Sequence, residues 1–209
     1  MEKSKKERVG KLLKEKVNKE FFMKHYISFN RAVSTYGALK RLYEDTEREL
    51  DFFEGYKNSF FKFYGIGRFV SNSFIDNYYN KMLYLRKAKV KECDIKTLTN
   101  ELIDKEKDKI QFSFTTKLLN IINDEKYPIY DSNVAKAFGF SAVYGDITQY
   151  IEQYNVITET YKSLLGDCTN IIGTFRKIFH QSKDLSDMRI LDIIVWKIGE
   201  EIVKNKQPI

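Results

Sequence analysis

The sequence SFTTKLLNIINDEKYPIYDSNVAKAF occupies residues 113–138 and contains two helix patterns joined by a short extended segment. The first pattern predicts a helix over 113–123, because apolar side chains recur there at three- and four-residue steps: Phe114, Leu118, Ile121 and Ile122. Pro128 disfavours helical backbone at the residue before it. The second helix pattern follows Asp131 and Ser132, and either side chain could cap it.

The composition of the whole chain also favours helices over a sheet. Two prolines and ten glycines in 209 residues leave few turn positions for a many-stranded sheet. A hydrophobic content of 43% with 15% aromatics supports a packed core, and the length suits about one domain. We therefore predict an all-α, compact multi-helix protein with one domain over residues 1–209.

Periodicity and capping residues predict further helices along the chain. They cover 5–22, 26–48 with a break near Gly37, 69–88, 94–107, the segment from Asp146 to about residue 165, 170–179, and a last helix from Ser186. Asp94, Asp146 and Ser186 are the expected N-caps. The aromatic-rich stretch 52–64 is more typical of a helix core than of a base-stacking surface.

Charge and cysteine content indicate the setting and the class of partner. A net charge of +7 predicts attraction to a polyanion such as nucleic acid, with a solvated lysine-rich surface as the alternative. Residues 1–20 hold eight Lys or Arg against four Glu, so their basic helix could lie along phosphates or face solvent. Cys93 and Cys168 have no paired spacing, which favours a reduced, cytoplasmic setting. We expect no signal peptide and no membrane span.

Lys117 and Asp131 are the strongest candidates for catalytic residues. Lys117 is one turn from both Phe114 and Ile121, so it points close to the apolar stripe of its helix. Burial there would lower the pKa of its ammonium group and supply a neutral amine nucleophile. The alternative is a lysine that extends its charged end to solvent. Asp131 could equally be a helix N-cap and no more.

The two residues occur in a frame that resembles a known enzyme family. Thr116-Lys117-Leu118, followed by Tyr127-Pro128-Ile129-Tyr130-Asp131-Ser132-Asn133-Val134, is similar to the helix-hairpin-helix DNA glycosylase superfamily. The branch with the 8-oxoguanine DNA glycosylase fold is the most similar. Leu191-Asp192 and Trp196-Lys197-Ile198-Gly199 also look like the closing helix of such domains. In this family the lysine attacks the sugar C1′ and the aspartate assists.

The resemblance implies a fold and a set of roles. It implies two helical lobes around a cleft, with a glycosylase-like core over about 92–205. Lys117 would be the Schiff-base nucleophile, and Asp131 would stabilise charge on the sugar. Two features depart from the family pattern. The separation of Lys117 and Asp131 is fourteen positions, about one helical turn shorter than in most relatives, and residues 111–115 replace a glycine-rich hairpin loop.

Further residues are candidates for binding DNA or the extruded base. Thr116, Ser132 and Asn133 belong to the family frame, and Phe138, Phe140 and Tyr144 follow it. The segment Tyr64-Gly65-Ile66-Gly67-Arg68 could grip a phosphate through backbone N–H groups or be a plain interhelix turn. The partner would be double-stranded DNA with a flipped base, bound by a monomer that needs no cofactor and no metal.

Three functions follow from these observations. The first is a DNA glycosylase, with or without AP lyase activity, that excises a damaged or modified, 8-oxoguanine-like base. The second is a non-catalytic nucleic-acid-binding or defence-associated module with the glycosylase fold. The third is a helical protein-interaction domain whose positive charge is incidental.

Overall fold

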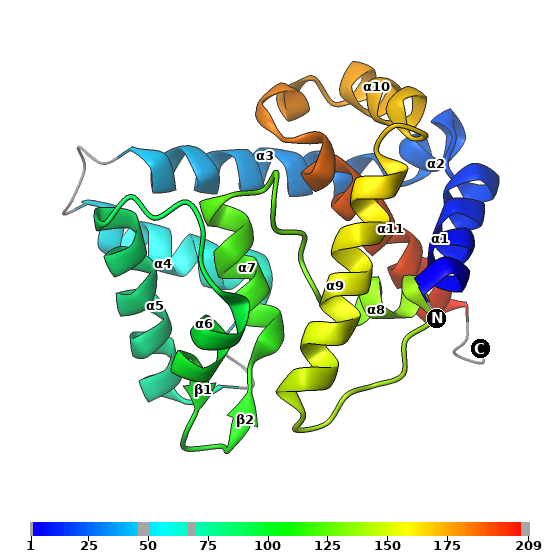
Figure 1. The fold of residues 1–209 in the computed structure, drawn as a ribbon. Helices are drawn as coiled ribbons and strands as arrows, with labels where there is room; N and C mark the ends of the chain where they lie inside the picture. The colour runs from blue at the N-terminus through cyan, green and yellow to red at the C-terminus, as the bar shows by residue number, and fades with distance from the viewer. Residues whose placement is uncertain (1, 46–50, 67–69, 206–209) are drawn as a thin grey trace.

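A computed structural model describes residues 2–45, 51–66 and 70–205 of the chain, and α-helices account for nearly all of its regular structure (Figure 1). The elements are α1 (Glu2–Lys16), α2 (Lys19–Lys24), α3 (Tyr26–Glu44), α4 (Asp51–Tyr64), α5 (Asn72–Lys87), α6 (Ile95–Glu101), β1 (Ile103–Asp104), β2 (Lys109–Ile110), α7 (Phe112–Ile122), α8 (Ser132–Phe138), α9 (Ile147–Leu164), α10 (Thr169–Ile178), the 3₁₀ helix η1 (His180–Asp184) and α11 (Asp187–Lys204). The prediction of an all-α protein is confirmed.

Three of the helix starts lie where capping residues predicted them. The Asp94 carboxylate accepts a hydrogen bond from the Thr97 N–H at 2.7 Å. Asp146 caps α9 in the same way, and the Ser186 hydroxyl accepts from the Arg189 N–H at 3.0 Å to start α11. Each cap satisfies backbone donors that have no partner inside the helix.

Three predicted boundaries are wrong. The helix expected over 5–22 is divided into α1 and α2, because Asn18 accepts a hydrogen bond from the Phe21 N–H and starts a new helix. No break occurs near Gly37, since α3 passes through this buried position, and a single glycine costs a helix only about 1 kcal/mol. The helix expected over 94–107 ends at Glu101.

The segment after α6 forms a short antiparallel hairpin of β1 and β2 in place of a helix. Its Asp104 carboxylate is buried and accepts hydrogen bonds from the Ser71 N–H at 2.9 Å and the Ser71 hydroxyl at 2.6 Å. These bonds link two segments more than thirty positions apart, so local helix propensity could not indicate them. The hairpin leads directly into α7.

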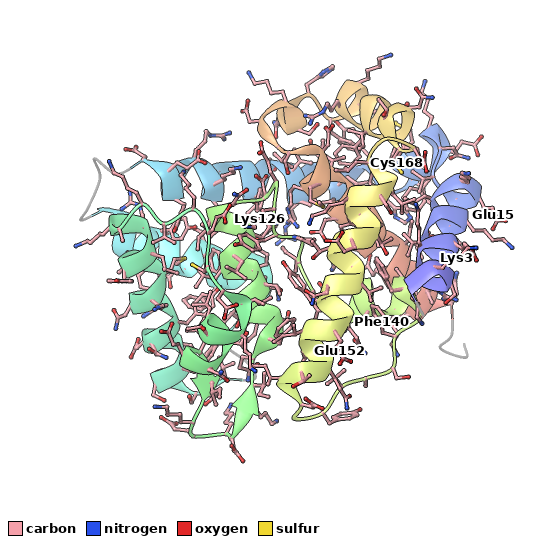
Figure 2. All side chains as sticks on the ribbon, in the orientation of Figure 1. Lys3, Glu15, Lys126, Phe140, Glu152 and Cys168 are labelled. Carbon is pink, nitrogen blue, oxygen red and sulfur yellow. The ribbon has the colours of Figure 1, made fainter. Side chains whose placement is uncertain are left out.

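The helices gather in two groups that share one long helix (Figure 1). Helices α4 to α7 lie on the left of the view, and α1 and α8 to α11 lie on the right. Helix α3 runs along the top behind both groups. Helix α8 packs most extensively on α11, and a hydrophobic core extends from Val9 in α1 to Ile198 in α11. Many charged side chains project outward around this core, as Lys3 and Glu15 do from α1 (Figure 2). None of the helices in the described parts of the chain is both long and apolar enough to cross a membrane.

Candidate functional site

Helix α7 holds Lys117 in an almost buried position. The side chain of Lys117 is 8% exposed, and its Nζ lies 4.9 Å from the ring centroid of Phe114 and 5.5 Å from that of Tyr64. Burial is the main reason that the pKa of Lys117 falls from 10.5 to about 8, since it disfavours the ammonium form. The negative charge of Asp131 opposes this shift, and the positive charge of Arg189 adds to it. A fraction of Lys117 is therefore a neutral amine near neutral pH.

Asp131 is both the N-cap of α8 and a neighbour of Lys117. Its Oδ1 accepts hydrogen bonds from the backbone N–H groups of Asn133 and Val134, each at 2.9 Å. Burial raises the pKa of the Asp131 carboxyl, while these two donors, the charge of Lys117 and the indole N–H of Trp196 lower it. The cap interpretation is thus correct, and it leaves the second carboxylate oxygen available to other groups.

Thr116 fixes the position of the segment that carries Asp131. Its hydroxyl has no exposed surface, donates to the Ser113 carbonyl at 3.0 Å and accepts from the Tyr130 N–H at 3.1 Å. The amide of Asn120 likewise donates to the Tyr127 carbonyl at 2.6 Å. Thr116 is one of the residues that the sequence suggests for DNA binding. In the structure its hydroxyl is buried and links α7 to the extended segment through these hydrogen bonds.

Lys117 and Asp131 line one cavity of about 180 Å³. Its walls come from α3, α4, α7, α8 and α11, and from the extended segment before α8. The other lining residues are mostly apolar or aromatic with a few polar groups: Ala32, Phe63, Tyr64, Ile129, Val134, Arg189, Asp192, Ile193 and Trp196. Such a lining is typical of a small-molecule or cofactor site.

A buried ion pair forms part of the cavity wall. The guanidinium of Arg189 donates to Asp192 Oδ2 at 2.5 Å and covers the ring of Tyr36 at 4.3 Å. Burial raises the pKa of Asp192 to about 7, with Arg189 lowering it and Asp131 raising it further. Arg189 is a residue of the cavity wall that no sequence motif singles out. Its only indication was an Arg and an Asp three positions apart in an otherwise apolar helix face.

Several polar atoms of this wall have no hydrogen-bond partner within the described residues. They are Arg189 Nε, Asp192 Oδ1 and the hydroxyl of Tyr64. The Ile129 N–H and the Tyr161 hydroxyl also lie close to the Asp192 carboxyl group, and the Ile129 N–H lowers its pKa. Buried polar atoms are nearly always paired in folded proteins, and these three atoms are enclosed with almost no exposed surface.

The remaining sequence candidates lie at varied distances from this cavity. Ser132 is exposed and Asn133 half-buried at the start of α8, and neither lines the cavity. Phe138 has no exposed surface and stacks on Phe140 at 5.5 Å, so it belongs to the core. Gly65 follows α4 with a φ of +65°, next to Tyr64 of the cavity wall. Gly67 and Arg68 lie outside the described residues.

No group of three or more His, Cys, Asp or Glu side chains in the described residues is arranged to bind a metal ion. Comparisons of this chain with protein-family models, with curated proteins and with solved structures found no match.

Proposed function

We propose that this protein is a DNA glycosylase with AP lyase activity that uses Lys117 as its nucleophile. The observation that carries the proposal is the almost buried amine of Lys117, with a pKa near 8, in the same cavity as the Asp131 carboxyl group. An amine of this kind attacks electron-poor carbon atoms, and a nearby carboxylate stabilises positive charge that develops on the sugar.

The reaction balances with these two groups alone. Neutral Nζ of Lys117 bonds to the sugar C1′ as the bond from C1′ to the base breaks, and the electron pair leaves with the base. The attacking nitrogen releases a proton and the departing base takes one up, and Asp131 carries the proton between them. The C1′–O4′ bond then breaks, O4′ takes the second proton that the nitrogen releases, and the sugar becomes an imine of Lys117. Asp131 takes a proton from C2′, and the C3′–O bond breaks with its electron pair on the departing 3′-phosphate, which cuts the strand. Water hydrolyses the imine and frees Lys117.

The cavity lining has both the polar and the aromatic groups that an extruded guanine-type base needs. The Watson–Crick edge of guanine presents N–H donors beside a carbonyl acceptor. Asp131, Asp192 and Arg189 line the cavity and carry acceptors and donors of the matching kinds. Trp196 and Phe63 supply apolar faces next to these groups. An 8-oxoguanine-like base is therefore the substrate class that we propose, and a cavity of this size fits one base better than a larger ligand.

The partner in this proposal is double-stranded DNA, and the acting form is a monomer in the cytoplasm. The net charge of +7 supports the choice of partner, because lysines and arginines that neutralise phosphates give affinity without sequence preference.

The test is covalent trapping with borohydride on oligonucleotides that carry 8-oxoguanine, uracil or an abasic site. Reduction converts the imine to a stable amine, so the wild-type protein should form an adduct that Lys117→Gln does not form. Lys126→Gln is the matched control, because Lys126 lies just after the same helix, is exposed and pairs with Glu92. Absence of an adduct on every substrate would rule out the lysine mechanism.

The net charge also favours a second candidate, a non-catalytic nucleic-acid-binding or defence-associated module. This candidate predicts tight, salt-sensitive DNA binding that is equal in the wild type and in Lys117→Gln, with no adduct in either. The trapping experiment therefore separates the two.

A further inference from the structure

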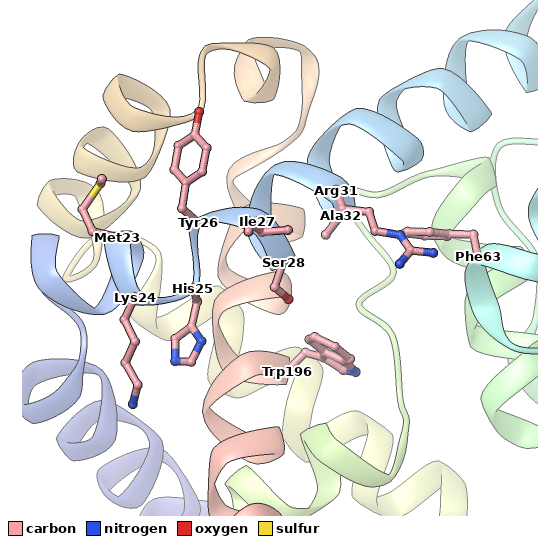
Figure 3. A pocket seen from close by; sticks show the side chains of 10 residues that line it. All are labelled: Met23, Lys24, His25, Tyr26, Ile27, Ser28, Arg31, Ala32, Phe63 and Trp196. Atoms are coloured by element: carbon pink, nitrogen blue, oxygen red, sulfur yellow. The ribbon is translucent and has the colours of Figure 1, made fainter.

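A second, wider hollow of about 640 Å³ adjoins the Lys117 cavity (Figure 3). The two share Ala32, Phe63 and Trp196 in their walls, so they lie side by side. We call the wider hollow the α2–α3 groove, because residues 23–28 around the junction of these helices form one side of it. Arg31 extends across it toward Phe63 (Figure 3).

An exposed isoleucine lies on this groove. Ile27 is in the first turn of α3 and is 84% exposed, although it is a large aliphatic residue. Tyr26 beside it stacks on Phe179 at 5.3 Å and is held in place by that contact. Ile27 is therefore a projecting apolar group on the rim, and Met23, 53% exposed, lies one turn before it.

The groove also carries positive charge. Lys24 and Arg31 are exposed on it. Glu201 pairs with Lys24 at 2.6 Å and with His25 at 2.8 Å, so the charge of Lys24 is largely balanced. Arg31 has no ion-pair partner within the part of the chain that the structure describes, which leaves its guanidinium available to an anion.

A DNA duplex with one nucleotide extruded matches both features. Extrusion leaves an apolar gap between two stacked base pairs, and phosphates flank that gap on each side. Apolar side chains such as Ile, Leu and Met enter base steps in this way, and arginine binds phosphate. A purely apolar partner would leave Arg31 without a counter-charge, so the charge complementarity favours nucleic acid over an apolar protein surface.

We infer that the α2–α3 groove receives the duplex beside the extruded nucleotide, with Ile27 filling the gap in the base stack and Arg31 binding a flanking phosphate. This inference rests on the proposed function, because the cavity must hold the extruded nucleotide. It assigns a positioning role to Ile27, which does not touch the reacting atoms.

The test is binding to a duplex with a single tetrahydrofuran residue, an abasic analogue that cannot form an imine. Fluorescence anisotropy would compare this duplex, the intact duplex and the single strand with the same residue. Ile27→Ala should weaken binding to the tetrahydrofuran duplex about tenfold and leave single-strand binding unchanged. Arg31→Gln should weaken binding to both duplexes. It should also reduce the slope of the log binding constant against log salt concentration by about one, as expected for the loss of one phosphate contact.

Leu42→Ala is the matched control, because Leu42 is an exposed apolar residue of α3, 39% exposed, that does not line the groove. This variant should bind all three probes as the wild type does. Wild-type affinity of Ile27→Ala for the tetrahydrofuran duplex would overturn the inference, and so would equal affinity of the wild type for the tetrahydrofuran and intact duplexes. Borohydride trapping of the wild type on a single-stranded abasic oligonucleotide should still give the Lys117 adduct. Because this readout depends on Lys117 and not on a base stack, it separates a failure of the groove from a failure of the proposed function.

Discussion

Gly199 in α11 lies against the backbone carbonyl of Asn133 in α8, and a Cβ atom at Gly199 would come within 1.9 Å of that oxygen. This close approach brings the start of α8, where Asp131 is the cap, next to the helix that carries Asp192 and Trp196. The cavity depends on this contact, because it needs residues of both helices.

Gly199→Ala should therefore destabilise the protein, because the new Cβ atom would clash with the backbone of Asn133, which cannot rotate away as a side chain can. We expect a loss of about 1–3 kcal/mol in the free energy of unfolding, measured by urea denaturation. Gly173→Ala is the control, since a Cβ there meets no atom within 4 Å, and it should be neutral or slightly stabilising. Equal stabilities of the two variants would contradict the close packing of α8 on α11.

Lys117→Met should stabilise the protein near neutral pH. The pKa of Lys117 is about 8 in the folded protein against 10.5 for an ordinary lysine, so the ammonium form destabilises the folded state relative to the unfolded chain. Removal of the charge should raise the free energy of unfolding at pH 7 by roughly 1–3 kcal/mol. This gain is present below pH 8 and disappears as pH rises to about 10.5, where the unfolded lysine also loses its proton.

Urea denaturation of both proteins at pH 7 and at pH 10.5 measures this difference. Lys162→Met, at an exposed lysine of α9, is the control and should change stability by less than about 0.5 kcal/mol. A Lys117→Met protein that is less stable than the wild type at pH 7 would show that the burial of this amine carries no penalty.

Asp131→Asn should separate the cap from the catalytic role. Asparagine caps helices as well as aspartate does, so the two hydrogen bonds at 2.9 Å can remain and the melting temperature should change little. The negative charge beside the sugar is lost, and base release should slow by about a hundredfold or more in single-turnover assays. Asp146→Asn, at the cap of α9, should leave the rate unchanged. An unchanged rate in Asp131→Asn would remove this residue from the mechanism.

The wild type should lose stability relative to Asp192→Asn as pH rises from about 4 to about 7. The pKa of Asp192 is raised from 3.8 to about 7, so the folded protein binds a proton that the unfolded chain has released. Wild-type stability therefore falls across this window, whereas the amide does not titrate. Acid-range urea denaturation of the two proteins measures the divergence, and parallel curves would contradict the raised pKa.

Local sequence patterns were sufficient for most of the helices and for two of the site residues. Caps such as Asp94, Asp146 and Ser186 act on N–H groups two or three positions away, and the spacing of Lys117 to Phe114 and Ile121 places it close to the apolar face of its helix. Such interactions depend on neighbours along the chain, and the sequence displays them directly.

Long-range packing set everything else that the site requires. The hairpin after α6 depends on the distant Ser71, and the cavity brings Tyr64, Lys117 and Arg189 together from three helices. In the sequence, Arg189 and Asp192 are two polar residues in an apolar helix face. Only the folded structure shows that each has an enclosed atom without a hydrogen-bond partner. Periodicity states which face of a helix is buried, but it does not state which other helix covers that face. The amino-acid order thus indicated most of the helices, their caps and a lysine beside an apolar face. The packing of α3, α4, α8 and α11 around that lysine buried its amine and made the cavity and the exposed Ile27 beside it.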